Sequence, residues 1–174
     1  ADRDWSSDVC SSDLYISASA GLNFGIDLKQ ANHNIVRENR ISSKPFDLGV
    51  RGDGLRLWYS TYNRIENNDI AQIRDVTVTN SPHNRFTGNT IRDSRRAFNF
   101  LFAHRSLVDR NHLEQNSTGI IALNSDGLTI RNNRILHAMD ASGAGIALKE
   151  TSAALVISWI VSVYFVPYLG TLIL

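Results

Sequence analysis

The sequence predicts an all-β fold, a right-handed parallel β-helix in which each repeat forms one coil of a solenoid. Three observations lead to this prediction: a repeat of 21 to 29 residues, alternating apolar residues at the start of each repeat, and an asparagine that returns at the same place. A fixed period of this length is typical of solenoids, in which each repeat packs only against its neighbours. The recurring asparagines stand at positions 39, 68, 89, 111 and 133.

Each repeat opens with apolar residues at every second position, which is the pattern of a strand with one buried face. Further isolated apolar positions follow, so we expect about three short strands in each coil, joined by tight bends, and five to six coils in all. The openings are Gly25-Ile26-Asp27-Leu28, Gly54-Leu55-Arg56-Leu57, Asp75-Val76-Thr77-Val78, Ala97-Phe98-Asn99-Phe100, Gly119-Ile120-Ile121-Ala122 and, slightly shifted, Gly145-Ile146-Ala147-Leu148.

The apolar positions also predict how the coils stack. Parallel strands about 4.8 Å apart place equivalent residues of successive coils above one another. Burial of one aliphatic side chain stabilises by only about 1.5–3 kcal/mol, so we expect no coil to be stable alone. The three predicted interior columns are Val36, Ile65, Phe86, Val108, Ile130; then Ile41, Ile70, Ile91, Leu113, Ile135; and Ile26, Leu55, Val76, Phe98, Ile120.

Two physical reasons account for the asparagine column. A bend between strands needs a residue that tolerates the left-handed backbone region, and asparagine does so better than other residues with a side chain. Stacked asparagine amides also hydrogen-bond along the axis as a ladder. We therefore interpret these five asparagines as structural and assign them no binding role.

The first fourteen residues do not continue the repeat. Residues 4–14 resemble the translation of a common sequencing-library adapter, so we interpret 1–14 as an artefactual leader and 15–152 as the β-helix repeat domain. The only cysteine, Cys10, lies in this leader. The repeat domain therefore has no disulfide framework.

The last part of the chain also departs from the repeat. Residues 153–174 contain no charged residue and have about the length of a membrane span. Within them, residues 154–170 resemble a transmembrane segment of the inner-membrane subunit of resistance-nodulation-division (RND) efflux pumps. We therefore predict an apolar C-terminal helix, kinked or broken near Pro167. Two origins stay open: a foreign segment joined near Ser152, or a native membrane anchor.

The charge of the chain is balanced, with a net charge of +1 at neutral pH. That balance argues against a nucleic-acid-binding surface, which would concentrate many more cations. A local cluster of arginines, interleaved with Asp75 and Asp93, is interpreted as solvated surface, with contact to an anion or sugar as the minority reading. Its members are Arg74, Arg92, Arg95 and Arg96.

Two phrases of the repeat carry a more specific resemblance. They are Gly52-Asp53-Gly54-Leu55-Arg56-Leu57-Trp58-Tyr59-Ser60 and Gly143-Ala144-Gly145-Ile146-Ala147-Leu148-Lys149-Glu150. Over about residues 21–152 the chain resembles NosD, the periplasmic accessory protein of nitrous-oxide reductase maturation. The resemblance implies a pectin-lyase-like β-helix in the periplasm that helps to assemble the reductase's copper centre. It also implies an ABC transporter and a membrane-anchored copper chaperone as partners.

Copper directs attention to the histidines, because imidazole is a good copper ligand. His83 and His104 lie near the same bend of adjacent coils, so they are the candidate metal ligands, with His137 and Met139 as a fainter pair. The other imidazoles are His33 and His112. The family's Met-Tyr-Ser phrase is replaced at 101–103 and 123–125, which removes the thioethers that Cu(I) favours and argues against tight copper binding by this stretch.

Two other classes of function stay open. Parallel β-helices resemble polysaccharide lyases, hydrolases and epimerases, which act with carboxylates and arginines in an open groove. The candidate groups here are Asp53, Asp75, Asp93 and Arg74, because Asp53 and Asp75 occupy comparable positions on adjacent coils and sugar hydrolysis needs two such carboxylates. A passive scaffold is the third class. We predict a non-catalytic solenoid, with carbohydrate binding or processing as the alternative.

Overall fold

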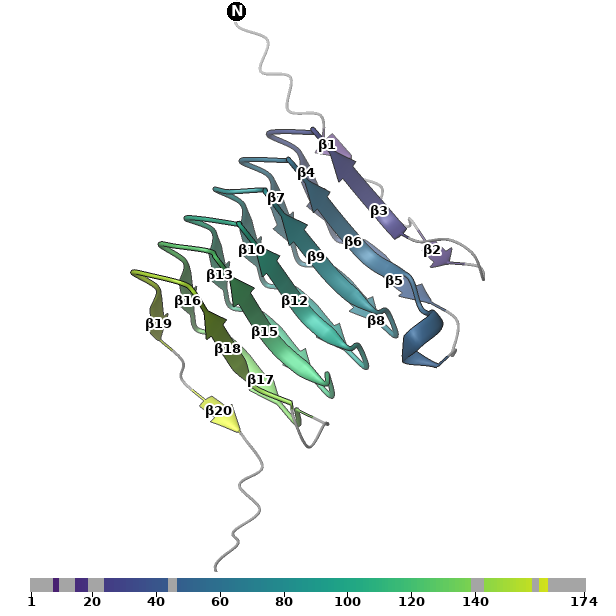
Figure 1. Ribbon diagram of the computed structural model, residues 1–174. Helices are drawn as coiled ribbons and strands as arrows, with labels where there is room; N and C mark the ends of the chain where they lie inside the picture. The colour runs from purple at the N-terminus through teal and green to yellow at the C-terminus, as the bar shows by residue number, and fades with distance from the viewer. Residues whose placement is uncertain are drawn as a thin grey trace, which may run out of the picture.

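The computed structural model describes residues 8–9, 15–18, 24–43, 47–138, 143–157 and 160–162. Three parallel sheets run along one axis, and each coil contributes one strand to each sheet in turn (Figure 1). We call them the first, second and third sheets, in the order in which a coil visits them. The turns that leave the first, second and third strand of a coil are the first, second and third turns.

The strand bounds show how regular the coils are. The first sheet holds β3 (Phe24–Lys29), β6 (Asp53–Trp58), β9 (Asp75–Thr79), β12 (Arg96–Leu101), β15 (Thr118–Leu123) and β18 (Ile146–Lys149). The second holds β1 (Asp8–Val9), β4 (Ile35–Arg37), β7 (Arg64–Glu66), β10 (Arg85–Thr87), β13 (Leu107–Asp109), β16 (Thr129–Arg131) and β19 (Leu155–Ile157). The third holds β2 (Tyr15–Ala18), β5 (Arg40–Ser43), β8 (Asp69–Ala71), β11 (Thr90–Arg92), β14 (His112–Glu114), β17 (Arg134–Leu136) and β20 (Ile160–Ser162).

The parallel β-solenoid that the repeats predict is confirmed. Strands β6 to β17 form about four turns in which every strand is paired on both sides, and shorter or partly described strands extend the sheets at both ends. The sequence predicted five to six coils, and the structure supports about four complete turns. One short 3₁₀ helix, η1 (Leu48–Val50), lies in the long connection of the first coil.

The three predicted apolar columns are confirmed by the strand register. Phe86 lies opposite Ile65 on one side and Val108 on the other, and the second column aligns in the same way. The third column aligns from Ile26 to Val76 and from Phe98 to Ile120, with a register shift between Arg96 and Asn99 where β12 pairs with β9. At the centre the rings of Phe86, Phe98 and Phe100 pack together, with centroids 5.2–5.7 Å apart. These rings are fully buried, so the stacked coils share one continuous core.

The asparagine ladder is also confirmed. Nδ2 of each asparagine donates to Oδ1 of the next, from Asn39 through Asn68, Asn89 and Asn111 to Asn133, at 2.9–3.0 Å. The same Nδ2 of Asn89 donates to the carbonyl oxygen of Ile65 at 2.8 Å, and the other inner asparagines bond equivalent carbonyls. The amides therefore satisfy backbone groups that the second turn would otherwise leave buried without partners.

One of the two reasons given for the asparagine column is wrong. The left-handed position of the second turn is the residue before each ladder asparagine: Asn67 has φ 53° and Gly88 has φ 68°. None of the five ladder asparagines has a positive φ. Hydrogen bonding along the axis, rather than backbone tolerance, explains their recurrence.

The predicted C-terminal helix is wrong where the structure describes it. Leu155–Ile157 and Ile160–Ser162 form strands β19 and β20, which pair in parallel with β16 and β17. The open edge of the preceding coil offers unpaired backbone groups, and a segment rich in valine and isoleucine suits a strand that pairs with them. Residues 158–159 and 163–174 lie outside the described residues, and Pro167 with them.

No helix within the described residues is long and apolar enough to cross a membrane. The interpretation of residues 1–14 and 153–174 as foreign segments, like the division of the chain at 14 and 152, stays a prediction.

Candidate functional site on the first turn

The first turn has the same backbone in every coil. It begins and ends with a left-handed residue, as at Tyr59 (φ 50°) and Tyr62 (φ 58°). Between them lies a small residue, and where the next coil has serine or threonine at this place, the backbone N–H donates to its hydroxyl: the N–H of Ser60 donates to Oγ of Ser81 at 2.9 Å. Because this geometry repeats, equivalent residues of the first turn lie above one another on the surface, and their side chains form exposed columns.

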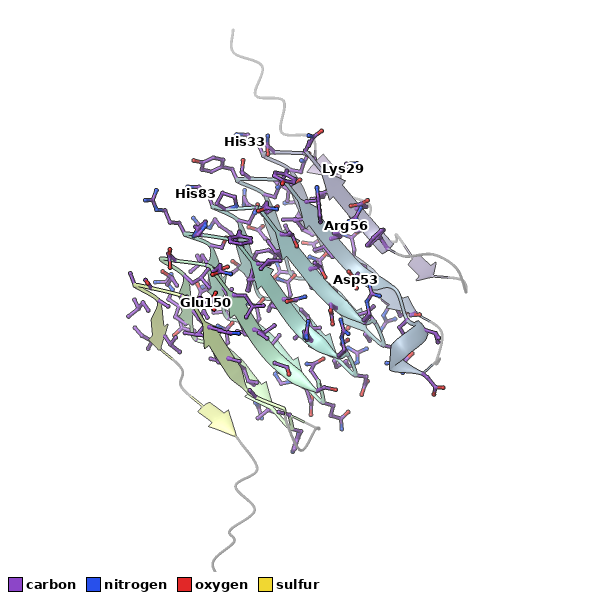
Figure 2. All side chains as sticks on the ribbon, viewed as in Figure 1. Lys29, His33, Asp53, Arg56, His83 and Glu150 are labelled. Carbon is purple, nitrogen blue, oxygen red and sulfur yellow. The ribbon has the colours of Figure 1, made fainter. Side chains whose placement is uncertain are left out.

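One of these columns is a stack of planar rings. The ring of Tyr62 lies 5.2 Å from that of His33, with an angle of 3° between the planes. On its other face it lies 5.0 Å from the ring of His83, at 6°. Both histidines lie along one edge of the solenoid (Figure 2). The stack covers both faces of Tyr62 and leaves the edges of the three rings toward solvent.

The two predicted metal ligands are neighbours on this turn but occupy different positions in it. The backbone N–H of His83 donates to the carbonyl oxygen of His104 at 2.9 Å, which places them on adjacent coils as expected. His83 is the last, left-handed residue of its turn, whereas His104 precedes the left-handed Arg105. Both line one open hollow, together with Arg105 and Asp126. Their role as metal ligands stays a prediction.

The hydrogen bonding of His104 does not favour a bound metal. Its Nδ1 accepts the backbone N–H of Asp126 at 3.0 Å, so in the neutral ring the proton is on Nε2. Neither nitrogen then offers a free lone pair. Among the residues that the structure describes, no group of three His, Cys, Asp or Glu side chains is arranged to hold a metal. The residues present therefore do not fit a resident copper ion; Cys10 and Met139 lie outside the described residues.

The first turns of two coils, together with the strand end before one of them, expose four aromatic side chains that the sequence analysis did not single out. They are Trp58, Tyr59, Tyr62 and Phe102, and we call them the aromatic ridge. Aligning the repeats would have found two of them, because Tyr59 and Phe102 take the place that Asn80 and Asn124 hold in other coils. The residues of this ridge are the largest exposed rings of the described solenoid.

The carboxylates proposed for sugar chemistry are paired with arginines. Asp53 is buried, and its Oδ1 accepts Nε of Arg74 at 2.8 Å while its Oδ2 accepts Thr77 Oγ1 at 2.9 Å. Asp75 is buried as well and binds Arg95, whose Nε lies 3.0 Å from Oδ1. The hydrogen bond to Asp75 raises the pKa of Arg95. Each carboxylate is thus neutralised by an arginine of the following coil.

Of the other two arginines of the cluster, Arg96 lies 3.9 Å from Asp75, and Arg92 lines a separate open hollow on the third sheet. Asp69 is bound by Arg92 from the following coil and by Arg40 from the preceding one. Burial raises the pKa of Asp69, but the hydrogen bonds from Arg92 and Arg40 outweigh it and lower the pKa overall. Asp93 takes part through its backbone carbonyl, which accepts Nη1 of Arg51 at 2.8 Å.

The remaining histidines meet at one glutamate. Nε2 of His112 lies 3.1 Å from Glu114 Oε2, and Nδ1 of His137 lies 3.8 Å from Oε1 of the same carboxylate. The hydrogen bond from His112 is the main reason that the pKa of Glu114 is lowered. His137 therefore faces a carboxylate; its predicted companion Met139 is outside the described residues.

Comparison with known proteins adds one match. A family model described as NosD, periplasmic copper-binding protein, matches residues 34–162, about three quarters of the chain. The matched region begins just before β4 and ends with β20, so it contains the first-turn column from Tyr62 onward. Searches of curated proteins and of solved structures found no match.

Proposed function

Because the chain belongs to the NosD family, we propose that it acts in the periplasm as an accessory protein for assembly of the copper centre of nitrous-oxide reductase. The observation that carries the proposal is the family match, which spans the solenoid from β4 to β20. The finer classification belongs to the same proposal: a right-handed, pectin-lyase-like β-helix. Its stacked coils supply a long, rigid surface on which partner proteins are held.

A non-catalytic scaffold is the form of the proposal that the side chains support. The two buried carboxylates on adjacent coils each bind an arginine, as Asp75 does with Arg95. Both carboxylates are buried and their oxygens already accept hydrogen bonds from neighbouring side chains, so neither is free to contact a sugar. The exposed first turn, in contrast, offers aromatic rings and imidazoles for contact with other molecules.

Copper enters this proposal as cargo that passes between proteins. His83 and His104 remain the proposed contact points on this chain, for brief capture rather than storage, because Nδ1 of His104 already accepts a backbone hydrogen bond. The proposed partners are the family's ABC transporter and membrane-anchored copper chaperone. In this proposal the transporter supports assembly of the copper centre from the membrane, and the chaperone delivers the copper.

The direct test is the copper content of the reductase. A host that makes the reductase but lacks its own NosD gene would receive this chain with an export signal. We expect copper per reductase, measured on the purified enzyme by mass spectrometry, to rise well above that of the same host with an empty vector. Equal copper content in the two strains would contradict the proposal.

The copper contacts have a separate test. We expect the purified chain to bind Cu(I) only weakly in competition with a chromophoric chelator, and the His83→Ala/His104→Ala variant to lose this weak binding. Stoichiometric binding that disappears in the double variant would show that these histidines form a resident site.

The carbohydrate alternative makes an opposite prediction. We expect no cleavage of polyuronates, followed by the absorbance of unsaturated products and by reducing ends. Turnover that is abolished in Asp75→Asn would establish the alternative, provided that this variant keeps the circular dichroism spectrum of the parent chain.

A further inference from the structure

The aromatic ridge exposes its rings to an unusual degree for a folded domain. Tyr59 is 53% exposed, Tyr62 52%, Phe102 42% and Trp58 37%. Apolar rings that cluster on a surface mark contact sites more often than single exposed residues do. Tyrosine, tryptophan and phenylalanine are also enriched at the centres of protein interfaces.

Folding does not explain why these residues stand where they do. Tyr59 and Phe102 open the first turn in the left-handed conformation, with φ of 50° and 53°. A bulky side chain is disfavoured there, whereas asparagine is well tolerated. The same position holds Asn80 and Asn124 in other coils. The two rings therefore occupy places where asparagine would fold at least as well and expose less apolar surface.

The ridge is held in shape before any ligand arrives. Trp58 packs edge-on against Tyr59, with ring centroids 5.7 Å apart at 67°. Tyr62 is sandwiched between His33 and His83. Tyr59 and Phe102 are two coils apart, which corresponds to roughly 10 Å along the axis. Rings that are already fixed lose little conformational entropy on binding, which favours their use as anchors.

The ring orientations argue against a sugar as the occupant. A pyranose stacks on the open face of an aromatic ring, but both faces of Tyr62 are covered by imidazoles. The rings of Trp58 and Tyr59 stand at 67° to each other and so do not form one flat platform. A protein surface, which accepts edges as well as faces and can enclose a protruding ring in a pocket, suits this arrangement better.

The charge around the ridge points to an acidic partner. The first turns and adjoining strand ends of the four coils that carry it, residues 29–33, 58–62, 79–83 and 101–105, contain no aspartate or glutamate. They contain the cations Lys29 and Arg105 and three histidines. Lys29, His33 and His83 lie along the same edge of the solenoid (Figure 2). At the equivalent positions of the next two coils, acidic side chains return at Asp126 and Glu150. Asp27, on the same strand as Lys29, is paired with Arg56, whose guanidinium lies 5.8 Å from the centroid of the Trp58 ring.

From these observations we propose that the aromatic ridge is the docking surface for a partner protein whose apolar pocket is rimmed by aspartate and glutamate. This inference rests on the proposed function, which supplies the two proteins used as probes below. The rings bury in the pocket and supply most of the affinity, while Lys29 and Arg105 attract the acidic rim and speed association.

The experiment compares binding of the full chain and of matched variants to two probes, purified metal-free reductase and the soluble domain of the chaperone. The ridge variant is Tyr59→Asn/Phe102→Asn, which installs the residue found in neighbouring coils. The control is Gln30→Asn, the same change in the same column outside the ridge. We expect the ridge variant to bind one probe at least about tenfold more weakly, with an unchanged circular dichroism spectrum and a melting temperature that is equal or higher. The control should bind like the parent chain, and added salt should weaken both.

Every other result overturns the inference. If a probe binds the parent chain and the ridge variant equally, the ridge is not the docking surface, although the proposed function stands. If neither probe binds, the inference fails, and the copper content of the reductase decides separately whether the proposed function survives. Ridge-dependent binding of a soluble polysaccharide, or a concentration-dependent dimer that the ridge variant loses, would assign the ridge to a different occupant.

Discussion

The asparagine ladder and the first-turn column of His33, Tyr62 and His83 are built by the same repeat but face opposite environments. In both, planar side chains from successive coils lie above one another along the axis. The ladder is buried, and each inner amide, such as that of Asn89, bonds two neighbours as well as a backbone carbonyl. The first-turn column is partly exposed, and its rings only stack.

The difference shows how to separate structural from functional repetition in this solenoid. An interior column must match the backbone groups around it, so stability alone accounts for its residues. A surface column has no such requirement, and asparagine or glycine at its left-handed positions would satisfy the backbone. Aromatic and imidazole groups there call for a partner outside the chain.

The largest effect is expected in the ladder. Replacing Asn89 with alanine leaves the carbonyl of Ile65 and the N–H groups of Asn68 without their partners in a buried place. We expect a loss of about 3 kcal/mol in the free energy of unfolding, measured by urea denaturation. His83→Ala, the matched change in the exposed column, should cost less than about 1 kcal/mol. Similar losses in the two variants would erase the distinction between the columns.

The ion pair of Asp75 and Arg95 should fall between these two cases. The carboxylate is 2% exposed, but its arginine is 43% exposed. Asp75→Asn leaves a guanidinium that water can still solvate, so we expect a loss of about 2 kcal/mol in the same measurement. A loss below about 0.5 kcal/mol would mean that the pair behaves as a surface salt bridge.

A small gain is expected on the aromatic ridge. Tyr59→Asn relieves a left-handed tyrosine and removes an exposed ring, so the free energy of unfolding should rise by about 0.5 kcal/mol. Thermal melting of the single variant beside the parent chain checks this. If the variant melts at a lower temperature, the ring of Tyr59 stabilises the fold, and its exposure no longer needs binding as an explanation.

The smallest expected effect is on stability at acidic pH. The pKa of Asp69 is lowered from 3.8 in the folded state by the hydrogen bonds from Arg92 and Arg40. Its ionised form therefore stabilises the fold above about pH 4, and this contribution is lost as the pH falls further through the folded-state pKa. Asp69→Asn should flatten the dependence of the melting temperature on pH below about pH 4. An unchanged slope would assign the acid sensitivity to other carboxylates.

The interior could be predicted from the sequence because each of its rules is local. Alternation of period two identifies the buried face of a strand, and a period near 22 residues stacks equivalent positions. The columns through Phe86 and the ladder through Asn89 follow from those two counts, and the strand register confirms both.

The surface could be predicted only in part. The neighbourhood of His83 and His104 follows from the repeat. The hydrogen bond from the N–H of Asp126 to His104 does not, because it depends on a one-residue difference between their places in the turn. The arginine partners of Asp53 and Asp75 come from the next coil, so the spacing of the carboxylates alone suggested a sugar site.

The sequence by itself determined that this chain is a stack of short parallel strands around aliphatic, phenyl and amide columns, since these follow from its periods. Tertiary structure decided the rest. It made strands of residues 155–157 and 160–162, because the last coil presents unpaired backbone that an apolar segment can satisfy. It also placed the left-handed residues one position before the ladder asparagines, rather than at them, and brought the exposed rings together in one ridge. In each case the outcome depended on the neighbouring coil, which no single repeat encodes.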